Sequence, residues 1–213
     1  MRKITEIYKD YKIMPQLAMH QLRVTAVAFA VCDSIGAEVD KESIIKACLL
    51  HDMANLIKFN LELFPEFNQP EGIDYWKIEQ AKQRQMYGTD EHAGSITIAR
   101  ALGASDEVLS NIHAIDFHNW DNVYKNGTLE NKISVYADSR VAPQGVVSLN
   151  SRIEEGSKRY EGLHPEIDAK RNILHDAIRA IEVEIFTQSS IKPEDITEES
   201  VTAIIESLKN YEI

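Results

Sequence analysis

Apolar residues recur at helical spacing along most of this chain, and few residues interrupt that spacing. Only 9 glycines and 6 prolines occur among 213 residues, so the stretches between them are long enough to form helices. Residues three and four positions apart lie on one face of a helix, whereas a half-buried strand would need apolar residues in alternation. We find the first pattern and not the second, and we therefore predict an all-α protein without β-strands.

Turn and capping residues set the limits of the predicted helices. Pro15 suits the first turn of a helix that runs to about Gly36, and Asp40 can cap a second helix that ends near His51. The segment 59–72 contains prolines and aromatic residues and is predicted to form an ordered loop or lid. Further helices are predicted at 75–86, 90–103, 105–118, 129–141, 149–160, 165–188 and 197–210.

Length and composition fit one domain. With 44% hydrophobic and 27% charged residues, the chain has the composition of a globular protein that folds by itself. We predict a single domain over 1–213, with a core at about 15–142 and a C-terminal helical extension at about 143–213. The long helices of the extension offer a surface for a homodimer.

The charge balance argues against an extended nucleic-acid partner. The formal net charge is −11 and the sequence pI is about 5.1, whereas proteins that bind DNA or RNA gather lysine and arginine on one face. A small phosphorylated substrate stays compatible with this charge, because bound metal ions dominate the local charge of a site.

The sequence gives no sign of a membrane partner or of export. It has no run of about eighteen apolar residues, and charges interrupt its N-terminus too often for a signal peptide. Cys32 and Cys48 lie within apolar helical patterns, as buried reduced thiols do. We therefore expect a cytoplasmic protein.

Histidine and aspartate residues fall on the apolar faces or at the ends of separate predicted helices. They are His20, His51, Asp52, His92, His118 and Asp138. Burying such groups without partners would cost several kcal/mol, and we expect the histidines to point inward. Imidazole and carboxylate groups on converging helices suit a divalent transition metal such as Fe, Mn, Co, Ni or Zn. Because a single inward histidine is more often a hydrogen-bonded core residue, the prediction depends on the whole series.

The same residues lie in short motifs that follow one another along the chain. The motifs are HQLRV at 20–24, ACLLHDMA at 47–54, EHAGSITIARALG at 91–103, IDFH at 115–118 and VYADSRV at 135–141. In this order they resemble the H…HD…H…H…D pattern of the HD superfamily, over roughly residues 15–142. The resemblance implies a helical HD-domain bundle and a metal-dependent phosphohydrolase.

The resemblance also implies the metal ligands. In the superfamily, the first His, the HD pair and the last Asp hold one ion, and two further histidines between them mark branches with two ions. Here the first set is His20, His51, Asp52 and Asp138, and the second set is His92 and His118, with Asp52 as the bridge. The dinuclear branches include the bacterial symmetrical diadenosine tetraphosphate hydrolases, to which this pattern is similar, the HD-GYP phosphodiesterases and a few di-iron oxygenases.

Two departures from the family pattern bear on the substrate. Many members continue as HDxGK, whereas Asn55 stands at the position of that lysine here and Lys58 lies further on. No GYP signature follows the HD pair, and its absence disfavours a cyclic dinucleotide substrate.

The favoured function is hydrolysis of a phosphate ester or anhydride, and the expected substrate is a nucleotide or dinucleotide. His51 and Asp52 are the predicted catalytic residues, and a metal-activated hydroxide is the predicted nucleophile. Arg23, Lys58 and Arg140 lie within a few residues of predicted ligands and are candidates to bind phosphate. The alternative for each is a solvated or salt-bridged surface charge, which is the favoured interpretation of Lys58 and Arg140. Two other functions stay open: a di-iron oxygenase with the same ligands, and a noncatalytic nucleotide-binding protein.

The remaining histidines and the large aromatic residues are predicted to be structural. An aromatic ring could stack on a nucleobase, but packing in the core is its more frequent role. Core packing, a solvent-exposed position or, for one histidine, a substrate contact is expected for Tyr75, Trp76, His113, Trp120, His164 and His175.

Overall fold

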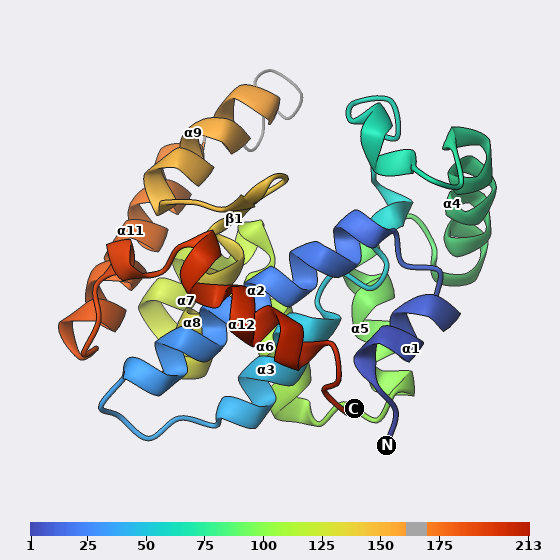
Figure 1. The fold of residues 1–213 in the computed structure, drawn as a ribbon. Helices are drawn as coiled ribbons and strands as arrows, with labels where there is room; N and C mark the ends of the chain where they lie inside the picture. Colours follow the sequence, from blue (N-terminus) through green and yellow to red (C-terminus); the bar gives the residue numbers. More distant parts are fainter. Residues whose placement is uncertain (161–169) are drawn as a thin grey trace.

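The protein is almost entirely helical, as its spacing of apolar residues predicts. The computed structural model describes residues 1–160 and 170–213, and Figure 1 shows how their helices are arranged. The α-helices are α1 (Ile4–Asp10), α2 (Pro15–Ser34), α3 (Lys41–Leu50), α4 (Ile73–Tyr87), α5 (Glu91–Ala101), α6 (Asp106–Ile115), α7 (Trp120–Asn126), α8 (Leu129–Asp138), α9 (Leu149–Tyr160), α11 (Arg171–Thr187) and α12 (Glu198–Leu208). Short 3-10 helices are η1 (Asn55–Ile57), η2 (Pro65–Asn68), η3 (Phe117–Asn119) and η4 (Pro193–Asp195).

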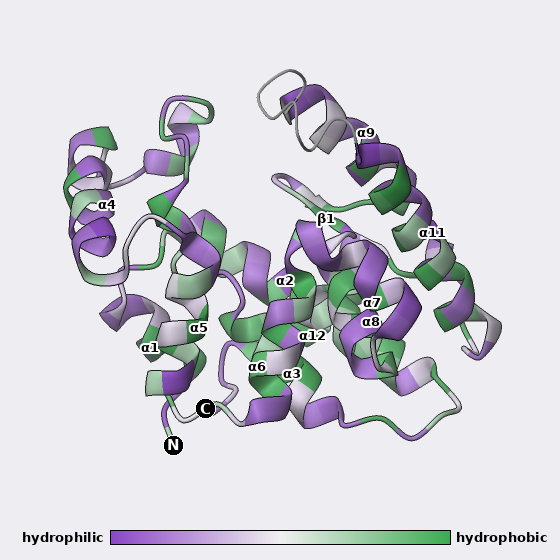
Figure 2. Ribbon diagram, turned by 180° about the vertical axis from the view of Figure 1, so that it is seen from behind, coloured by the Kyte–Doolittle hydropathy of each residue, from purple (hydrophilic) through white to green (hydrophobic). Residues whose placement is uncertain are grey.

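Helix α2 is the central element of the fold. It packs against α3, α8 and α12, so it has apolar neighbours on several sides. Its buried residues accordingly lie on more than one face, among them Leu22, Val24 and Val27. Figure 2, seen from behind, shows green hydrophobic segments in the ribbons of α3 and α6, which lie near the middle of the molecule beside α2. A helix that is apolar on most sides is expected at the centre of such a bundle.

The predicted capping residues begin their helices as expected. The Asp40 side chain accepts a hydrogen bond from Ser43 N at 3.1 Å and starts α3. Asp90 accepts one from Ala93 N at 2.9 Å and starts α5. Such caps satisfy backbone N–H groups that the first turn of a helix leaves without a partner. They place the first and last turns of α3 and α5, which carry candidate ligands.

The segment before α8 differs from the prediction. We predicted one helix from Ser105 to His118, but α6 ends at Ile115. Asp116 then accepts a hydrogen bond from His118 N at 3.0 Å and begins η3. Helix α7 follows in a stretch that was expected to form turns, and α1 was not predicted either. A new capping group therefore changes the direction of His118.

A short β-hairpin corrects the prediction of a protein without strands. Helix α8 ends at Asp138 instead of residue 141, and Val141–Ala142 (β1) pairs antiparallel with Gly145–Val146 (β2). Each strand has two residues, which is too short to show an alternating pattern in the sequence. The hairpin contacts α2, so it lies next to the helix that carries His20.

The C-terminal residues complete the bundle. Helix α12 packs along α2, and the two ends of the chain pair with each other, since Ile4 N donates to Tyr211 O at 2.8 Å and Arg2 N donates to Ile213 O at 2.9 Å.

Within the described ranges, no helix combines the length and apolar character needed to cross a membrane.

Residues between α3 and α5 form a side lobe made of η1, η2 and α4. Figure 1 shows this lobe beside α5 and α1, apart from α9 and α11. Backbone carbonyls in the lobe are bound by side chains of α4: Trp76 Nε1 donates to Asn68 O at 3.2 Å, and Gln80 Nε2 donates to Leu56 O at 2.7 Å. The predicted loop at 59–72 is therefore ordered, and Trp76 has the packing role expected of it.

Two glycines in helices allow a matched test of how closely α5 approaches the turn after α3. A Cβ at Gly94 would lie 2.8 Å from the Cβ of Ala54, whereas a Cβ at Gly156 would meet only the flexible end of Arg152. Alanine gains about 1 kcal/mol over glycine in a helix, but overpacking costs about 1–3 kcal/mol. We therefore expect Gly94→Ala to lower the free energy of unfolding and Gly156→Ala to raise it or leave it unchanged. Urea unfolding of both variants measures this, and equal stabilisation by the two would contradict the close approach.

Candidate metal centre

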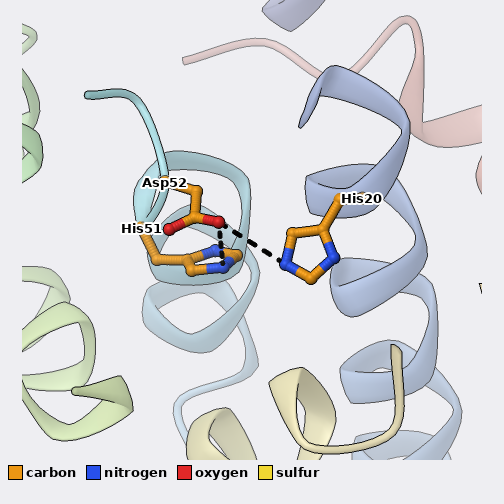
Figure 3. Close-up of side chains that lie close together, drawn as sticks. All are labelled: His20, His51 and Asp52. Atoms are coloured by element: carbon orange, nitrogen blue, oxygen red, sulfur yellow. Dashed lines mark ion pairs between the residues drawn. The ribbon is translucent and has the colours of Figure 1, made fainter. Parts of the chain in front are cut away.

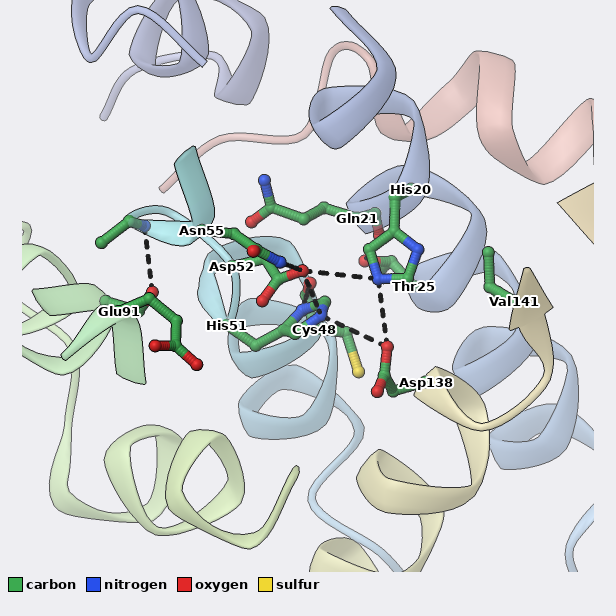
Figure 4. A network of polar contacts seen from close by, with 12 residues as sticks. His20, Gln21, Thr25, Cys48, His51, Asp52, Asn55, Glu91, Asp138 and Val141 are labelled. Carbon is green, nitrogen blue, oxygen red and sulfur yellow. Dashed lines mark hydrogen bonds and ion pairs between the residues drawn. The ribbon is translucent and has the colours of Figure 1, made fainter. Parts of the chain in front are cut away.

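Four of the predicted ligands come together from three helices. His20 lies in the second turn of α2, His51 is the C-cap of α3 and Asp52 follows it, and Asp138 is the last residue of α8. Figure 3 shows His20 facing His51 and Asp52 across the space between α2 and α3. Figure 4 adds Asp138, which approaches the same point from below. The packing of α2 on α3 and α8 thus creates the cluster.

The donor atoms of the cluster are spaced as metal ligands are. His20 Nε2 lies 3.0 Å from Asp138 Oδ1 and 3.6 Å from Asp52 Oδ2. His51 Nε2 lies 3.5 Å and 3.6 Å from the same two oxygens. With metal–ligand bonds of about 2.1 Å, neighbouring donors are about 3.0 Å apart at right angles and about 3.4 Å apart in a tetrahedron. The donor atoms of His20, His51 and Asp52 all lie within 4.8 Å of one another, as ligands of one divalent ion would, and Asp138 adds a carboxylate oxygen that contacts both imidazoles.

The orientation of His51 supports this fit. Its Nδ1 lies 2.8 Å from the carbonyl oxygen of Cys48, and because a carbonyl can only accept, Nδ1 donates. A ligating histidine is usually held in this way by its other ring nitrogen. His51 Nε2 is buried and has no hydrogen-bond partner among the described residues. It is therefore directed at the cluster and needs a group to bind.

Charge is strongly coupled within the cluster. Burial lowers the pKa of His51, but the negative charges of Asp52 and Asp138 outweigh it and raise that pKa to about 9. Burial alone would raise the pKa of Asp138, but His20 and His51 hold it well below its usual range. The carboxylates thus favour a positive charge beside them, which a bound metal ion would supply.

Further side chains support the HD pair from outside the cluster. Asn55 Nδ2 donates to Asp52 Oδ2, the oxygen that faces both histidines. The hydroxyl of Tyr8 in α1 donates to Leu49 O at 2.7 Å, near the end of α3. The sequence did not single out Tyr8, because nothing in its pattern shows that α1 packs against the end of α3.

The two histidines predicted for a second ion do not join this group. Within the described part of the chain, the group whose donor atoms all lie within 4.8 Å of one another consists of His20, His51 and Asp52. His118 is exposed on η3, which corrects the expectation that it points inward. His92 is half-buried, its Nε2 has no hydrogen-bond partner among the described residues, and its ring lies 5.7 Å from that of His113.

The three predicted phosphate-binding cations are all engaged. Arg23 donates from Nε to Glu198 at 2.8 Å, and Lys58 forms an ion pair with Glu91. Arg140 is buried, and its guanidinium donates to backbone carbonyls of Val147 at 2.6 Å and Ile196 at 2.9 Å, and also to Pro193 O and the Tyr136 hydroxyl. Arg140 therefore ties the end of α8 to the C-terminal segment, and its guanidinium is buried instead of facing solvent, where a phosphate contact would need it.

The other residues considered earlier have structural positions. Trp120 is buried and donates from Nε1 to Ile115 O at 3.3 Å, which matches the expectation of core packing. His175 is buried in α11, and His113 is exposed. His164 lies outside the described residues.

Comparison with known proteins gives one match. The family profile described as "HD domain" matches residues 17–138, more than half of the chain, and this range contains every candidate ligand. Searches of curated proteins and of solved structures found no match.

The charge coupling predicts a pH dependence for the metal-free protein. The pKa of His51 is about 9 in the folded state and 6.5 in a model peptide, so its stabilising contribution is full below about pH 6.5 and is lost as pH rises through about 9. We expect the unfolding free energy, measured with chelator present, to fall over this window in the wild type and to fall less in His51→Gln. His113→Gln, at an exposed position, is the control, and an unchanged slope in His51→Gln would contradict the coupling.

The burial of Arg140 predicts a structural defect. Arg140→Met leaves several buried acceptors without a donor, and we expect a loss of about 3 kcal/mol in unfolding free energy. The metal affinity of the folded protein should not change, because Arg140 touches none of the ligands. Arg100→Met, an exposed arginine on α5, is the matched control. Weakened metal binding with unchanged stability would assign Arg140 to the site instead.

Proposed function

Because the chain belongs to the HD-domain family, we propose that it is a metal-dependent phosphohydrolase that cleaves a phosphate ester or anhydride of a small molecule. The observation that carries the proposal is the cluster of His20, His51, Asp52 and Asp138. In this cluster, Nε2 of each histidine lies 3.0–3.6 Å from one oxygen of each aspartate. Family membership alone indicates this general kind of activity.

In the proposed site, each residue has a defined role. His20, His51, Asp52 and Asp138 hold the ion, which when bound supplies a Lewis acid for a phosphoryl oxygen and lowers the pKa of water. Cys48 O keeps Nδ1 of His51 protonated, so that Nε2 presents its lone pair. Asn55 holds Asp52 Oδ2 toward the two imidazoles. The carboxylates of Asp52 and Asp138 can also accept a hydrogen bond from the attacking water and orient it.

A second ion is a further part of the proposal. His92, with its unpartnered Nε2, and His118 would hold it together with Asp52, as the family pattern implies. His118 is exposed on a short 3-10 helix, so its side chain has room to change rotamer. Binding of a second ion would require such a change, because the ring does not point inward in this structure. Whether one or two ions bind is decided by measurement of metal content.

Metal content and hydrolysis test the proposal together. We expect protein purified without oxygen to contain one or two divalent ions per chain and to hydrolyse at least one member of a phosphoester and nucleotide panel. Asp52→Ala should lose both the ion and the activity, because Asp52 faces both histidines of the cluster. Asp74→Ala, at an exposed position in α4, is the matched control and should retain both.

Other results would redirect the proposal. Bound iron with oxygen consumption and no hydrolysis would indicate an oxygenase. Tight nucleotide binding without turnover would indicate a noncatalytic binding protein. Protein that takes up no divalent ion under any loading condition would refute the metal site itself.

A further inference from the structure

The net charge of the metal ion and its ligands limits how many negatively charged phosphate groups of a substrate the site can balance. A divalent ion held by Asp52 and Asp138 leaves no net charge among these groups, since the histidines are neutral when they ligate. A substrate with one phosphate adds the least negative charge to such a neutral site, whereas each further phosphate adds negative charge that other cations would have to balance.

The cations nearest the ligands in sequence are already matched with acids or carbonyls. Arg23, one turn after His20 on α2, has both Nε and Nη2 within 2.8 Å of Glu198 Oε1. Glu198 is fixed in turn, because its other oxygen accepts from Val146 N at 2.8 Å. Lys58 pairs with Glu91, next to His92. Each pair would have to open before its cation could bind a phosphate.

Neutral amides occupy positions beside the HD pair where a cation could bind phosphate. Asn55 stands where many family members have lysine, and it donates to Asp52. Gln21 is completely buried, and neither atom of its carboxamide has a hydrogen-bond partner among the described residues. Figure 4 shows the Gln21 side chain extending from α2 toward the segment that carries Asp52 and Asn55. An amide can donate a hydrogen bond to a phosphate oxygen, but it brings no positive charge to balance an additional phosphate.

We infer that the site takes a substrate with a single phosphate, a monoester with a neutral polar remainder, and discriminates against polyphosphate chains. This inference rests on the proposed function. The acidic surface acts in the same direction, because a net charge of −11 disfavours the approach of a highly charged anion.

A series of nucleoside mono-, di- and triphosphates with the same base tests the inference, since only the number of phosphates changes. We expect kcat/KM of the metal-loaded protein to be at least tenfold higher for the monophosphate. Metal content is measured after each assay, because polyphosphates chelate metal ions. Equal or higher kcat/KM for the triphosphate would overturn the inference and leave the phosphohydrolase proposal intact.

Charge variants test the cause of the preference. Glu198→Gln keeps an acceptor for Val146 N but removes the ion pair of Arg23, and Asn55→Lys places a cation beside Asp52. Both should reduce the preference for monophosphate several-fold. Glu184→Gln is the matched control, because it makes the same charge change at the pair of Glu184 with Lys132 between α8 and α11. An equal effect in all three variants would indicate net charge alone and would overturn the assignment to these residues.

Binding provides a readout that does not need turnover. Calorimetry of the metal-loaded protein with orthophosphate and with tripolyphosphate should show tighter binding of orthophosphate at constant metal content. Tighter binding of tripolyphosphate, or binding of neither, would overturn the inference. If orthophosphate binds but no ester in the panel is hydrolysed, the hydrolase proposal fails while the preference for one phosphate stands.

Discussion

The attraction between two partly buried carboxylates, Asp52 and Asp138, and two imidazoles, His20 and His51, is the interaction on which the arrangement of the central helices depends. The four residues come from three helices, and Nε2 of each histidine lies within 3.6 Å of an oxygen of each aspartate. Such groups are costly to bury unless they are paired or bind an ion. The helices that carry them must therefore pack closely, and α2 does so by burying apolar residues against α3, α8 and α12. The hydrophobic core and the candidate site thus both depend on the packing of α2 against α3 and α8.

Much of the fold follows from local patterns, and the errors have local causes. Asp40 and Asp90 cap helices where the sequence places them, because a cap needs only nearby backbone N–H groups. His118 lies on η3 and not on a longer α6, because Asp116 ends α6 and caps a new turn, and helical spacing alone does not distinguish the two outcomes. The hairpin at β1 and β2 was missed because its strands are too short to produce a period. The cap by Asp116 and the hairpin each depend on which local hydrogen bonds form, and the spacing of apolar residues does not show this.

In the candidate site, the residues that lie in sequence motifs could be predicted, whereas contacts between residues far apart in the sequence could not. The sequence places the candidate ligands on α2, α3 and α8 because motif and helical face agree, and the family match covers all of these residues. The role of Arg140 was not predictable, since its acceptors Val147, Pro193 and Ile196 belong to segments that come near it only in the folded chain. The pairing of Arg23 with Glu198 has the same origin, because the two residues are 175 positions apart. Sequence motifs indicate candidate ligands, whereas the ion pairs around these ligands are arranged by tertiary contacts.

The paired ends of the chain have a topological consequence. Arg2 and Ile213 exchange backbone hydrogen bonds at 2.9 Å, so the described fold is close to a closed ring. A short flexible peptide between the two ends would need to span only a few ångströms, and the chain could then be opened elsewhere at an exposed turn without disturbing α2. Circular permutation would in this way separate the order of the helices from their packing. The His, HD and Asp motifs could be presented in a different order along the chain while still meeting in the same place.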